Sequence, residues 1–478
     1  MFVFAKTLQQ KRHNMMLTQS NIQEALDRFH KIFVHDEIDK IATESSFLRR
    51  ATNKIYPLHF LLMMTLQMLR HQLQSLASMT DLIAAMPGAS QVSPQAIAER
   101  LKNNYTVRFL ERCYSRILNE RLQLTSNQST VKGILGRFNN VFAEDSTLCN
   151  LHMQASEFFR GVGGGASKAA YKIHLLWNCA TSDITSLTIT SGTITDQSTC
   201  NYILAFIKPG DLILRDLGYF SLATFNAIDE ANAYFVSRLK RGLVIYTAEG
   251  ELIKDICKHI ERLLERAPLA ELKVLIGKTA KLPVRLVVGR VPDDVYNKRM
   301  RKAREVAKSQ GYQVTKAAKE WNRYTIFITN APESKLKGEE LFVVYKLRWQ
   351  IELIFKSWKS LLHIDMIKGH NGNRIKCFIL ARLITILLIS SLFSHVSRCV
   401  YLSTGRHLSL SKFTSWIMRN IEIFMDSSVA HMLIKRLDSF IPYCCMQQRS
   451  RKTTSELLEV SATYHYLYLS TEELLQCA

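Results

Sequence analysis

The 478-residue sequence is poor in acidic side chains and lacks both cysteine pairs of the metal-binding type and a nucleotide-binding loop. Its 41 Asp and Glu residues face 63 Lys and Arg residues, for a formal net charge of +22. The ten cysteines include no Cys-x-x-Cys pair, so neither a zinc site nor a disulfide framework is predicted, and a reducing, cytoplasmic compartment is expected. The run Gly161 to Gly165 lacks the Gly-Lys-Ser/Thr ending of a phosphate-binding loop, and we interpret it as a flexible hairpin connection.

Signals for a membrane are missing as well. No secretory signal opens the chain, where Lys6, Lys11 and Arg12 precede a polar run. The most apolar stretch, Phe378 to Phe393, is interrupted by Arg382 and falls short of a membrane span, which predicts a buried helix. With no membrane expected, the positive charge predicts a polyanionic partner, namely nucleic acid. The length predicts roughly two to four domains.

The first 130 residues are predicted to be helical. Apolar residues recur at helical spacing in Asn21 to Phe33 and in Leu58 to Leu76. Within Gln91 to Leu101, Ser93 is a suitable N-cap and Pro94 suits the first helical position. This short polar helix could be the reading helix of a helix-turn-helix, and an ordinary surface helix fits the same residues equally well.

After residue 130 the pattern changes to β-prone segments with a helix between the last two, which predicts a mixed α/β sheet. The expected strands are Phe142 to Leu148, Tyr171 to Cys179, Ser186 to Thr190 and Asp211 to Leu214, and the expected helix is Cys200 to Lys208. A second β-prone block follows, with a strongly basic segment, Lys298 to Lys319, inside it. Its strands are predicted at Leu272 to Gly277, Leu282 to Val291 and Tyr324 to Thr329. From Leu341 onward the chain is predicted to be helical.

The segment YKLRWQIELIFKSWK, Tyr345 to Lys359, is the most informative stretch. On a helix, its functional head groups fall within an arc of roughly 80°, beside a wholly apolar arc. The head groups are those of Tyr345, Arg348, Glu352, Lys356 and Lys359. One carboxylate among three cations and a phenol suits a metal ion that holds a phosphodiester. The alternative is the solvated stripe of an amphipathic helix.

Two-metal phosphoryl transfer needs further carboxylates on rigid elements. Asp145 lies at the end of a β-prone segment, and Asp216 follows the predicted strand Asp211 to Leu214. Glu144 is a rival to Asp145, and adjacent residues of a strand point to opposite faces. Asp211 is a rival to Asp216 but follows Pro209 and Gly210, so a turn role suits it better.

The order Y-x2-R-x3-E-x6-K resembles the signature helix of DDE transposases of the insertion-sequence-four family. Further motifs of that family have similar counterparts in this sequence. They are Asp145 before Ser-Thr, Asp216 before Leu-Gly-Tyr-Phe, and the segment Phe235 to Lys240. The resemblance implies an α/β fold with a ribonuclease-H-like catalytic core, residues 131–240 and 341–395, interrupted by a β-rich insertion, residues 241–340. It also implies a helical DNA-binding region at 1–130 and a helical region at 396–478 for possible dimerisation.

The same resemblance implies that Asp145, Asp216 and Glu352 are catalytic and hold two Mg²⁺ ions, for which Mn²⁺ can substitute. The expected reaction is cut-and-paste transposition, in which terminal inverted repeats are bound, cleaved and joined to target DNA. The expected partners are double-stranded DNA, at transposon ends and target, and a second copy in a synaptic dimer, in a nucleoid-associated protein. Expected DNA contacts are Tyr345, Arg348, Lys356, Lys359 and Arg238.

One departure from the family pattern concerns the aromatic residue on which a flipped base stacks. The position 28 residues before Glu352 is Tyr324, and Trp321 lies three residues earlier. Either ring could stack on a base or pack at a strand start, so a hairpin intermediate is left open. Two other functions are also open: an inactive transposase-derived DNA-binding inhibitor or repressor, and a ribonuclease-H-like nuclease with a host role.

Overall fold

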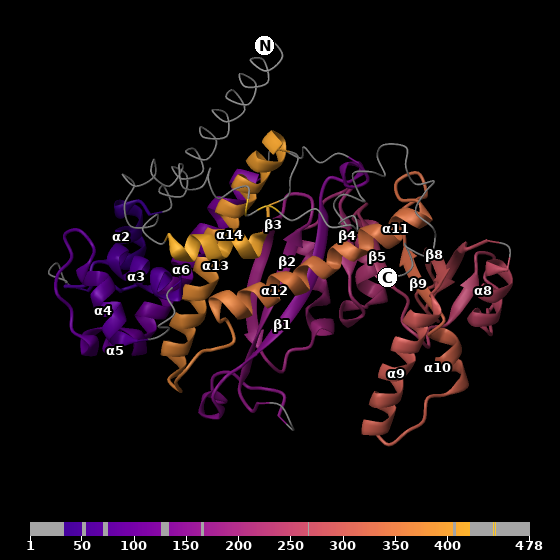
Figure 1. Ribbon diagram of the computed structural model, residues 1–478, viewed down its shortest axis with the longest axis horizontal. Helices are drawn as coiled ribbons and strands as arrows, with labels where there is room; N and C mark the ends of the chain where they lie inside the picture. Colours follow the sequence, from indigo (N-terminus) through magenta and orange to yellow (C-terminus); the bar gives the residue numbers. More distant parts are fainter. Residues whose placement is uncertain are drawn as a thin grey trace, which may run out of the picture.

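A computed structural model describes residues 33–49, 54–69, 75–125, 133–163, 167–265, 267–404 and 408–420, with residues 443 and 445. A helical region lies at one end, a long sheet runs through the middle, and a β-rich unit with its own helices lies at the other end (Figure 1). The predicted helix Asn21 to Phe33 and most of the C-terminal region from Tyr401 lie outside the described residues.

The N-terminal helices pack together and against a later helix, α13. They are α2 (His35–Glu44), α3 (Pro57–Leu69), α4 (Leu76–Ala84), α5 (Pro94–Lys102) and α6 (Asn104–Thr125). The capping prediction for α5 is confirmed, because the Ser93 hydroxyl accepts a hydrogen bond from the Ala96 N–H and Pro94 opens the helix. The predicted helix Leu58 to Leu76 ends earlier, at Leu69, and the next described helix begins at Leu76.

Nine strands form one mixed sheet in the order β3-β2-β1-β4-β5-β9-β8-β7-β6. The strands are β1 (Val141–Asn150), β2 (Ala170–Asn178), β3 (Asp183–Ser191), β4 (Leu212–Arg215), β5 (Tyr234–Arg238), β6 (Ile245–Thr247), β7 (Leu269–Ile276), β8 (Leu282–Arg290) and β9 (Tyr324–Thr329). β4 is parallel to both β1 and β5, and the other pairings are antiparallel. The mixed α/β sheet predicted from the sequence is confirmed.

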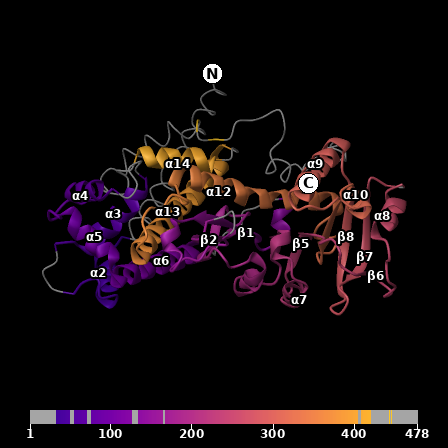
Figure 2. The same cartoon turned by 90° about the horizontal axis from the view of Figure 1, so that it is seen from below.

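The sheet is buried on both faces because its central strands carry apolar residues at consecutive positions, which point to opposite faces. Val141, Ala143 and Leu214 belong to the core on one face, and Phe142 and Ile213 belong to the core on the other. Figure 2 shows α12 running along the first face and α7 (Leu222–Glu230) on the opposite side. The helix predicted at Cys200 to Lys208 is a 3-10 helix that begins and ends earlier, η3 (Asp196–Ala205).

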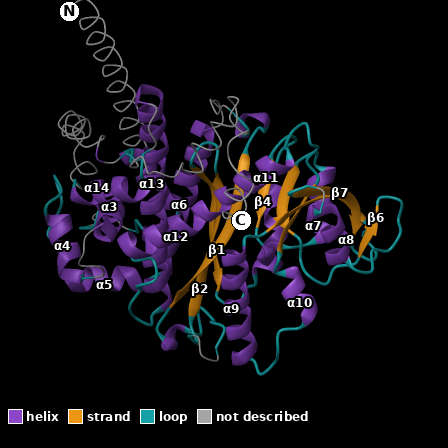
Figure 3. Ribbon diagram, turned by 45° about the vertical axis from the view of Figure 1, so that its right-hand side comes forward, coloured by secondary structure: helices purple, strands orange, loops and turns teal. Residues whose placement is uncertain are grey.

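The β-rich unit continues the same sheet rather than forming a separate one, since β9 pairs with β5 (Figure 3). Its helices are α8 (Ile256–Leu264), α9 (Asp293–Ser309) and α10 (Lys316–Trp321). The basic segment predicted between two strands forms most of α9 and α10. These two helices form an arm that extends beyond the sheet (Figure 1).

The chain then returns to the sheet through α11 (Gly338–Tyr345), a 3-10 turn η5 (Lys346–Arg348) and α12 (Trp349–Leu362). The last described helices are α13 (Gly372–Thr404) and α14 (Leu410–Arg419). Among the described residues, Gly372–Arg398 is long and apolar enough to cross a membrane, yet 89% of its most apolar window is buried inside the protein. The prediction of a buried helix is confirmed, while the expectation that the stretch is too short to span was wrong.

Candidate active site

Two predicted acids reach the same face of the sheet through strand alternation. Asp145 in β1 has the parity of Ala143, which faces the α12 side. Asp216 follows the last residue of β4 and caps η4 (Leu217–Tyr219), where its Oδ2 accepts a long hydrogen bond from Gly218 N–H at 3.4 Å. Because β1 and β4 are parallel with Glu144 opposite Arg215, the two acids come directly after paired residues.

The guanidinium of Arg348 contacts all three predicted catalytic acids. Its Nη2 lies 2.9 Å from Glu352 Oε1, its Nη1 3.4 Å from Asp145 Oδ2, and its Nε 3.7 Å from Asp216 Oδ1. The Arg348 side chain is only 14% exposed. Three elements far apart in the sequence therefore present their carboxylates to one shielded cation.

The electrostatics of Asp145 reflect this crowding. Burial raises the pKa of its carboxyl to about 6, and the charges of Asp216 and Glu352 add to the increase. The Ser146 N–H, which donates to Asp145 Oδ1 at 2.8 Å, and the positive charge of Arg348 act in the opposite direction. A carboxylate in this position needs neighbouring positive charge to stay ionised.

The rival acids have other partners. Glu144 points to the opposite face, where its Oε2 accepts a hydrogen bond from Arg215 Nη2 at 2.9 Å, and burial raises its pKa to about 7. Asp211 accepts hydrogen bonds from the Lys208 N–H and the Asn140 side-chain amide. The turn role predicted for Asp211 is confirmed.

The signature segment differs from the single helix predicted for it. α11 ends at Tyr345, η5 carries Arg348, and α12 starts only at Trp349. The Tyr345 ring is buried instead of facing outward, and its hydroxyl donates to the Arg215 carbonyl at 3.2 Å. Burial raises the pKa of Tyr345 to about 12, so this hydroxyl remains a donor. The helical periodicity of the sequence could not show that Lys346–Arg348 forms a tighter 3-10 turn.

Lys356 and Lys359 of the segment lie on the same side as Glu352 and already contact the protein. Lys359 Nζ donates to the Leu148 carbonyl of β1 at 3.2 Å, which ties α12 to that strand. Lys356 Nζ lies 5.3 Å from the ring centre of Trp349, whose side chain is 49% exposed. The cation and the ring together form a surface beside the acids.

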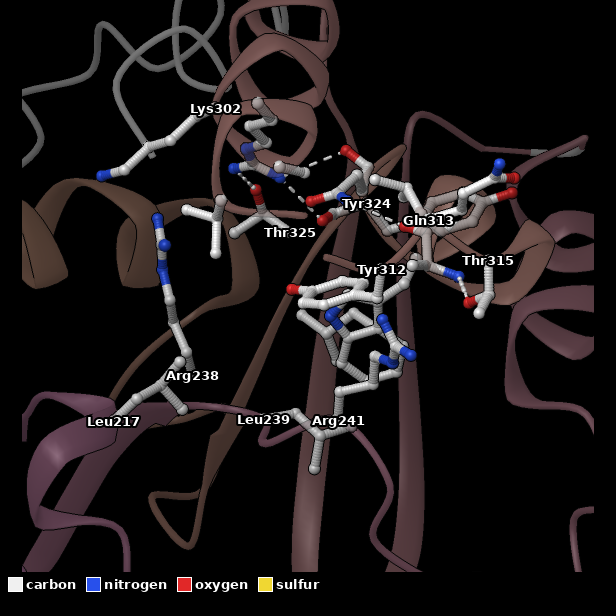
Figure 4. Close-up of a pocket in the computed structure, with 18 residues that line it drawn as sticks. Leu217, Arg238, Leu239, Arg241, Lys302, Tyr312, Gln313, Thr315, Tyr324 and Thr325 are labelled. Atoms are coloured by element: carbon white, nitrogen blue, oxygen red, sulfur yellow. Dashed lines mark hydrogen bonds between the residues drawn. The ribbon is translucent and has the colours of Figure 1, made fainter. Parts of the chain in front are cut away.

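The remaining predicted DNA-contact residues, Arg238, Trp321 and Tyr324, line one cavity of about 780 Å³. Leu217, the residue after Asp216, lines it too, so the cavity starts beside the acids (Figure 4). None of the eighteen described residues that line it is acidic. Tyr324 is 4% exposed and Trp321 is half-buried, so neither ring is fully accessible to a ligand in the cavity.

Sequence reasoning missed four residues of this cavity: Arg241, Arg299, Lys302 and Tyr312. Figure 4 places the Tyr312 ring within the cavity, and this side chain is 53% exposed. Arg299 donates to the Tyr324 carbonyl and to Thr325 Oγ1, which holds α9 against β9, and burial lowers its pKa to about 10. The basic composition of residues 298–319 was the available signal, but it could not show which cations face inward.

Among the described residues, no three His, Cys, Asp or Glu side chains approach one another closely enough to ligate one metal ion as they stand. The positions of Asp145, Asp216 and Glu352 explain this, because the Arg348 guanidinium lies between them. Their donor set of carboxylate oxygens is nevertheless the type that hard divalent cations select.

The sequence of this chain is similar to those of known transposases. The family model described as "Transposase DDE domain" matches residues 136–388, more than half of the chain. The transposase for insertion sequence element IS231B of Bacillus thuringiensis subsp. berliner is 28% identical over 351 residues, covering 70% of this chain and 73% of that protein. The transposase for IS1151 of Clostridium perfringens is 28% identical over 376 residues, covering 75% and 78%.

The transposase for IS231E of Bacillus thuringiensis subsp. finitimus is 26% identical over 425 residues, covering 86% of this chain and 88% of that protein. Among solved structures, the piggyBac transposase synaptic complex with hairpin DNA aligns with a TM-score of 0.44 at 14% identity, covering 90% of this chain and 87% of that one. The family match spans β1, β4 and α12, which carry the three acids. The chain therefore belongs to the DDE transposase family, and the resemblance found in its sequence motifs is confirmed.

Proposed function

We propose that this transposase binds the terminal inverted repeats of an insertion sequence and catalyses metal-dependent cleavage and transfer of DNA strands, by a cut-and-paste route. The observation that carries the proposal is the convergence of Asp145, Asp216 and Glu352 on one cation. Buried or half-buried carboxylates are costly unless they are paired or coordinate metal, so a cluster of three is typical of a functional site.

Two Mg²⁺ ions, with Mn²⁺ able to substitute, fit this site because Asp145, Asp216 and Glu352 offer only carboxylate oxygens. When bound, such ions activate the attacking oxygen and stabilise the leaving oxygen of a phosphodiester. The three acids would hold the metal, and the rigid strands and helix that carry them would fix its position relative to DNA.

Arg348, Lys356 and Lys359 would supply positive charge to the phosphodiester. Arg348 is placed to exchange its carboxylate partners for a phosphate, since guanidinium binds either group in the same forked geometry. In this proposal the role of Tyr345 is to position the residues that follow it, because its buried hydroxyl already donates a hydrogen bond to the Arg215 carbonyl. It also lies under Arg348, whose Cζ is 5.9 Å from the centre of the Tyr345 ring.

The basic cavity next to Asp216 would take a single-stranded part of the substrate. Its four cations suit a phosphate backbone, and an aromatic face suits a nucleotide base. Tyr312 presents more ring surface than Trp321 or Tyr324, so we propose it as the first stacking surface. Trp321 and Tyr324 would form the floor, and Arg238 would contact the backbone.

For the architecture, we propose that β1 to β5 with α11 and α12 form a ribonuclease-H-like core, and that residues 241–340 are the insertion. The sheet order and the parallel set β1, β4 and β5 support this division. The helices of residues 1–130 would bind DNA, and residues 396–478 would contribute to a synaptic homodimer. The net charge of +22 supports double-stranded DNA, at the transposon ends and the target, as the partner.

The test uses the full chain with duplexes that carry the inverted repeats flanking its gene. Wild-type protein should cut the repeat end and join the freed 3′-hydroxyl to target DNA in Mg²⁺ or Mn²⁺, and should do neither in EDTA. Glu352→Gln should lower the rate at least roughly 100-fold because a metal-holding oxygen is lost. Glu339→Gln, an exposed glutamate of α11, is the matched control and should react at the wild-type rate.

The other functions predict different results in the same assay. An inhibitor or repressor would bind the repeats tightly without cutting them, with or without metal. A nuclease with a host role would cut DNA without joining the 3′-hydroxyl to a target. Either result would refute the proposal of cut-and-paste transposition, and so would full activity of Glu352→Gln.

A further inference from the structure

We propose that Arg215 is a positioning residue on which the three catalytic elements are assembled, an inference that rests on the function proposed above. Arg215 does not face the site. It is fully buried on the opposite face of the sheet, yet its side chain contacts the strand that carries Asp145 and its peptide bond leads to Asp216. Its carbonyl oxygen contacts Tyr345, which ends the helix before the one that carries Glu352.

The side chain connects β4 to β1. Arg215 Nη2 donates to Glu144 Oε2 at 2.9 Å, and Glu144 is the residue before Asp145. The two residues are register partners in the parallel pairing of β1 and β4. A slip between these strands would separate the pair, so the pair fixes how far Asp145 stands from Asp216. The same Nη2 donates to the Cys200 carbonyl of η3 at 2.7 Å, which anchors the connection that leads into β4.

The backbone connects β4 to the signature segment. Arg215 is the last residue of β4, so its peptide bond leads directly to Asp216. Its carbonyl accepts the Tyr345 hydroxyl at 3.2 Å. Tyr345 ends α11, three residues before Arg348 and seven before Glu352. Each of the three acids therefore lies within seven residues, along the chain, of Arg215 or of a residue that is hydrogen-bonded to it.

The chemistry of the Arg215–Glu144 pair suggests that Arg215 fixes the positions of β4 and β1 rather than adding to the free energy of unfolding. A buried arginine needs all its donors satisfied, but Arg215 Nε and Nη1 have no hydrogen-bond partner in the described part of the chain. An apolar pair of similar size would fill the same space without burying charge, and such replacements are often neutral or stabilising. An apolar pair at positions 144 and 215 would hold the two strands in register less strictly, because its contacts have no direction.

The decisive variant is the double replacement Glu144→Met with Arg215→Met in the full-length protein. It removes both charges together, so the melting temperature should stay within about 5 °C of wild type. The single-turnover cleavage rate at saturating DNA should still fall roughly 10- to 100-fold, since small displacements of reacting groups cost that much. The affinity for Mn²⁺, measured by calorimetry without DNA, should fall as well. The Kd for the repeat DNA should not change.

Two variants keep the test decisive if the double variant does not fold. Arg215→Lys retains the buried charge, but its shorter side chain does not bring a nitrogen to the position of Nη2 between Glu144 and the Cys200 carbonyl, so its rate should fall at least about tenfold. Glu144→Gln retains an acceptor for Arg215 and should stay within about threefold of wild type. Glu271→Met with Arg285→Met, which removes a cross-strand ion pair of β7 and β8, is the matched control and should leave the rate unchanged.

A wild-type rate and Mn²⁺ affinity in the double variant or in Arg215→Lys would overturn the inference, because position would then not depend on Arg215. An equal loss in Glu144→Gln would overturn it too, since the hydrogen bond is kept there. If wild type binds Mn²⁺ but cuts no repeat DNA, the proposed function fails, and the affinities of the variants still decide the role of Arg215.

Discussion

Replacing Arg348 by Met should make the stability of the catalytic region depend on divalent metal. In the wild-type protein the guanidinium compensates the three acids, at 2.9 Å from Glu352, 3.4 Å from Asp145 and 3.7 Å from Asp216. Without it, three negative charges would face one another across a shielded site. Metal ions would then be the remaining source of positive charge between them.

The magnitude follows from the burial of the partners. At 2.9 and 3.4 Å, unit charges attract by roughly 5–6 kcal/mol each at an effective dielectric constant of about 20. Desolvation offsets much of this, and breaking a largely buried pair costs about 3–5 kcal/mol. Asp216 is 41% exposed, so its contact adds less than about 1 kcal/mol. We expect a loss of about 3 kcal/mol, or roughly 6–12 °C for a cooperative unit of this size.

The assay is thermal unfolding of wild type and Arg348→Met in EDTA and in excess Mg²⁺. Mg²⁺ should raise the midpoint of the variant more than that of wild type, in which metal has to displace the guanidinium. Arg116→Met is the matched control, because Arg116 is 19% exposed and lies 2.7 Å from Glu120 on α6. It should show no difference in response to metal. Equal stability of Arg348→Met and wild type in EDTA, or an equal response to Mg²⁺, would refute the reasoning.

Three further predictions concern DNA binding, acid and the buried helix. Arg238→Gln with Lys302→Gln should reduce the slope of log affinity for DNA against log salt by about 1–2, and an unchanged slope would remove both residues from the interface. Burial lowers the pKa of His174 to about 4, so the unfolded chain binds a proton that the folded chain does not. The free energy of unfolding should fall from about pH 6.5 to pH 4 and level off below, and His174→Gln should flatten this slope in denaturant titrations. Arg382→Leu should cost about 2–4 kcal/mol in the same titrations, because it removes the hydrogen bonds that the buried Arg382 guanidinium donates to the carbonyls of His363, Phe378 and Met366. A neutral effect would show that those carbonyls find other donors.

The sequence singled out Asp145 and Asp216 through their family motifs and Glu352 through helix periodicity as well, and the structure brings these acids to one guanidinium. The alternation of β1 separates Asp145 from Glu144, and the turn chemistry around Pro209 explains Asp211. The segments β1 to β5 and β7 to β9 were predicted near their observed bounds, since their β-prone runs are short and bounded by polar residues.

Long-range contacts were not predictable in this way. The tight turn at Lys346–Arg348 depends on Tyr345 reaching the Arg215 carbonyl, a contact between residues 130 positions apart. Arg241, in the turn after β5, and Lys302, in α9, line the same cavity because β5 pairs with β9. The compact 3-10 helix η3 likewise depends on the buried Arg215 side chain that holds its Cys200 carbonyl.

Under the proposed function, the pairing of β5 with β9 would affect how faithfully the protein selects its DNA. Arg238, which lines the cavity, is the last residue of β5 and follows Ser237, the register partner of Arg215. A strand that fits the cavity poorly would therefore strain the same backbone that holds Asp216. If the cavity binds DNA and the acids cut it, as proposed, an incorrect substrate would be penalised in the chemical step as well as in binding, because paired strands of one sheet connect the two.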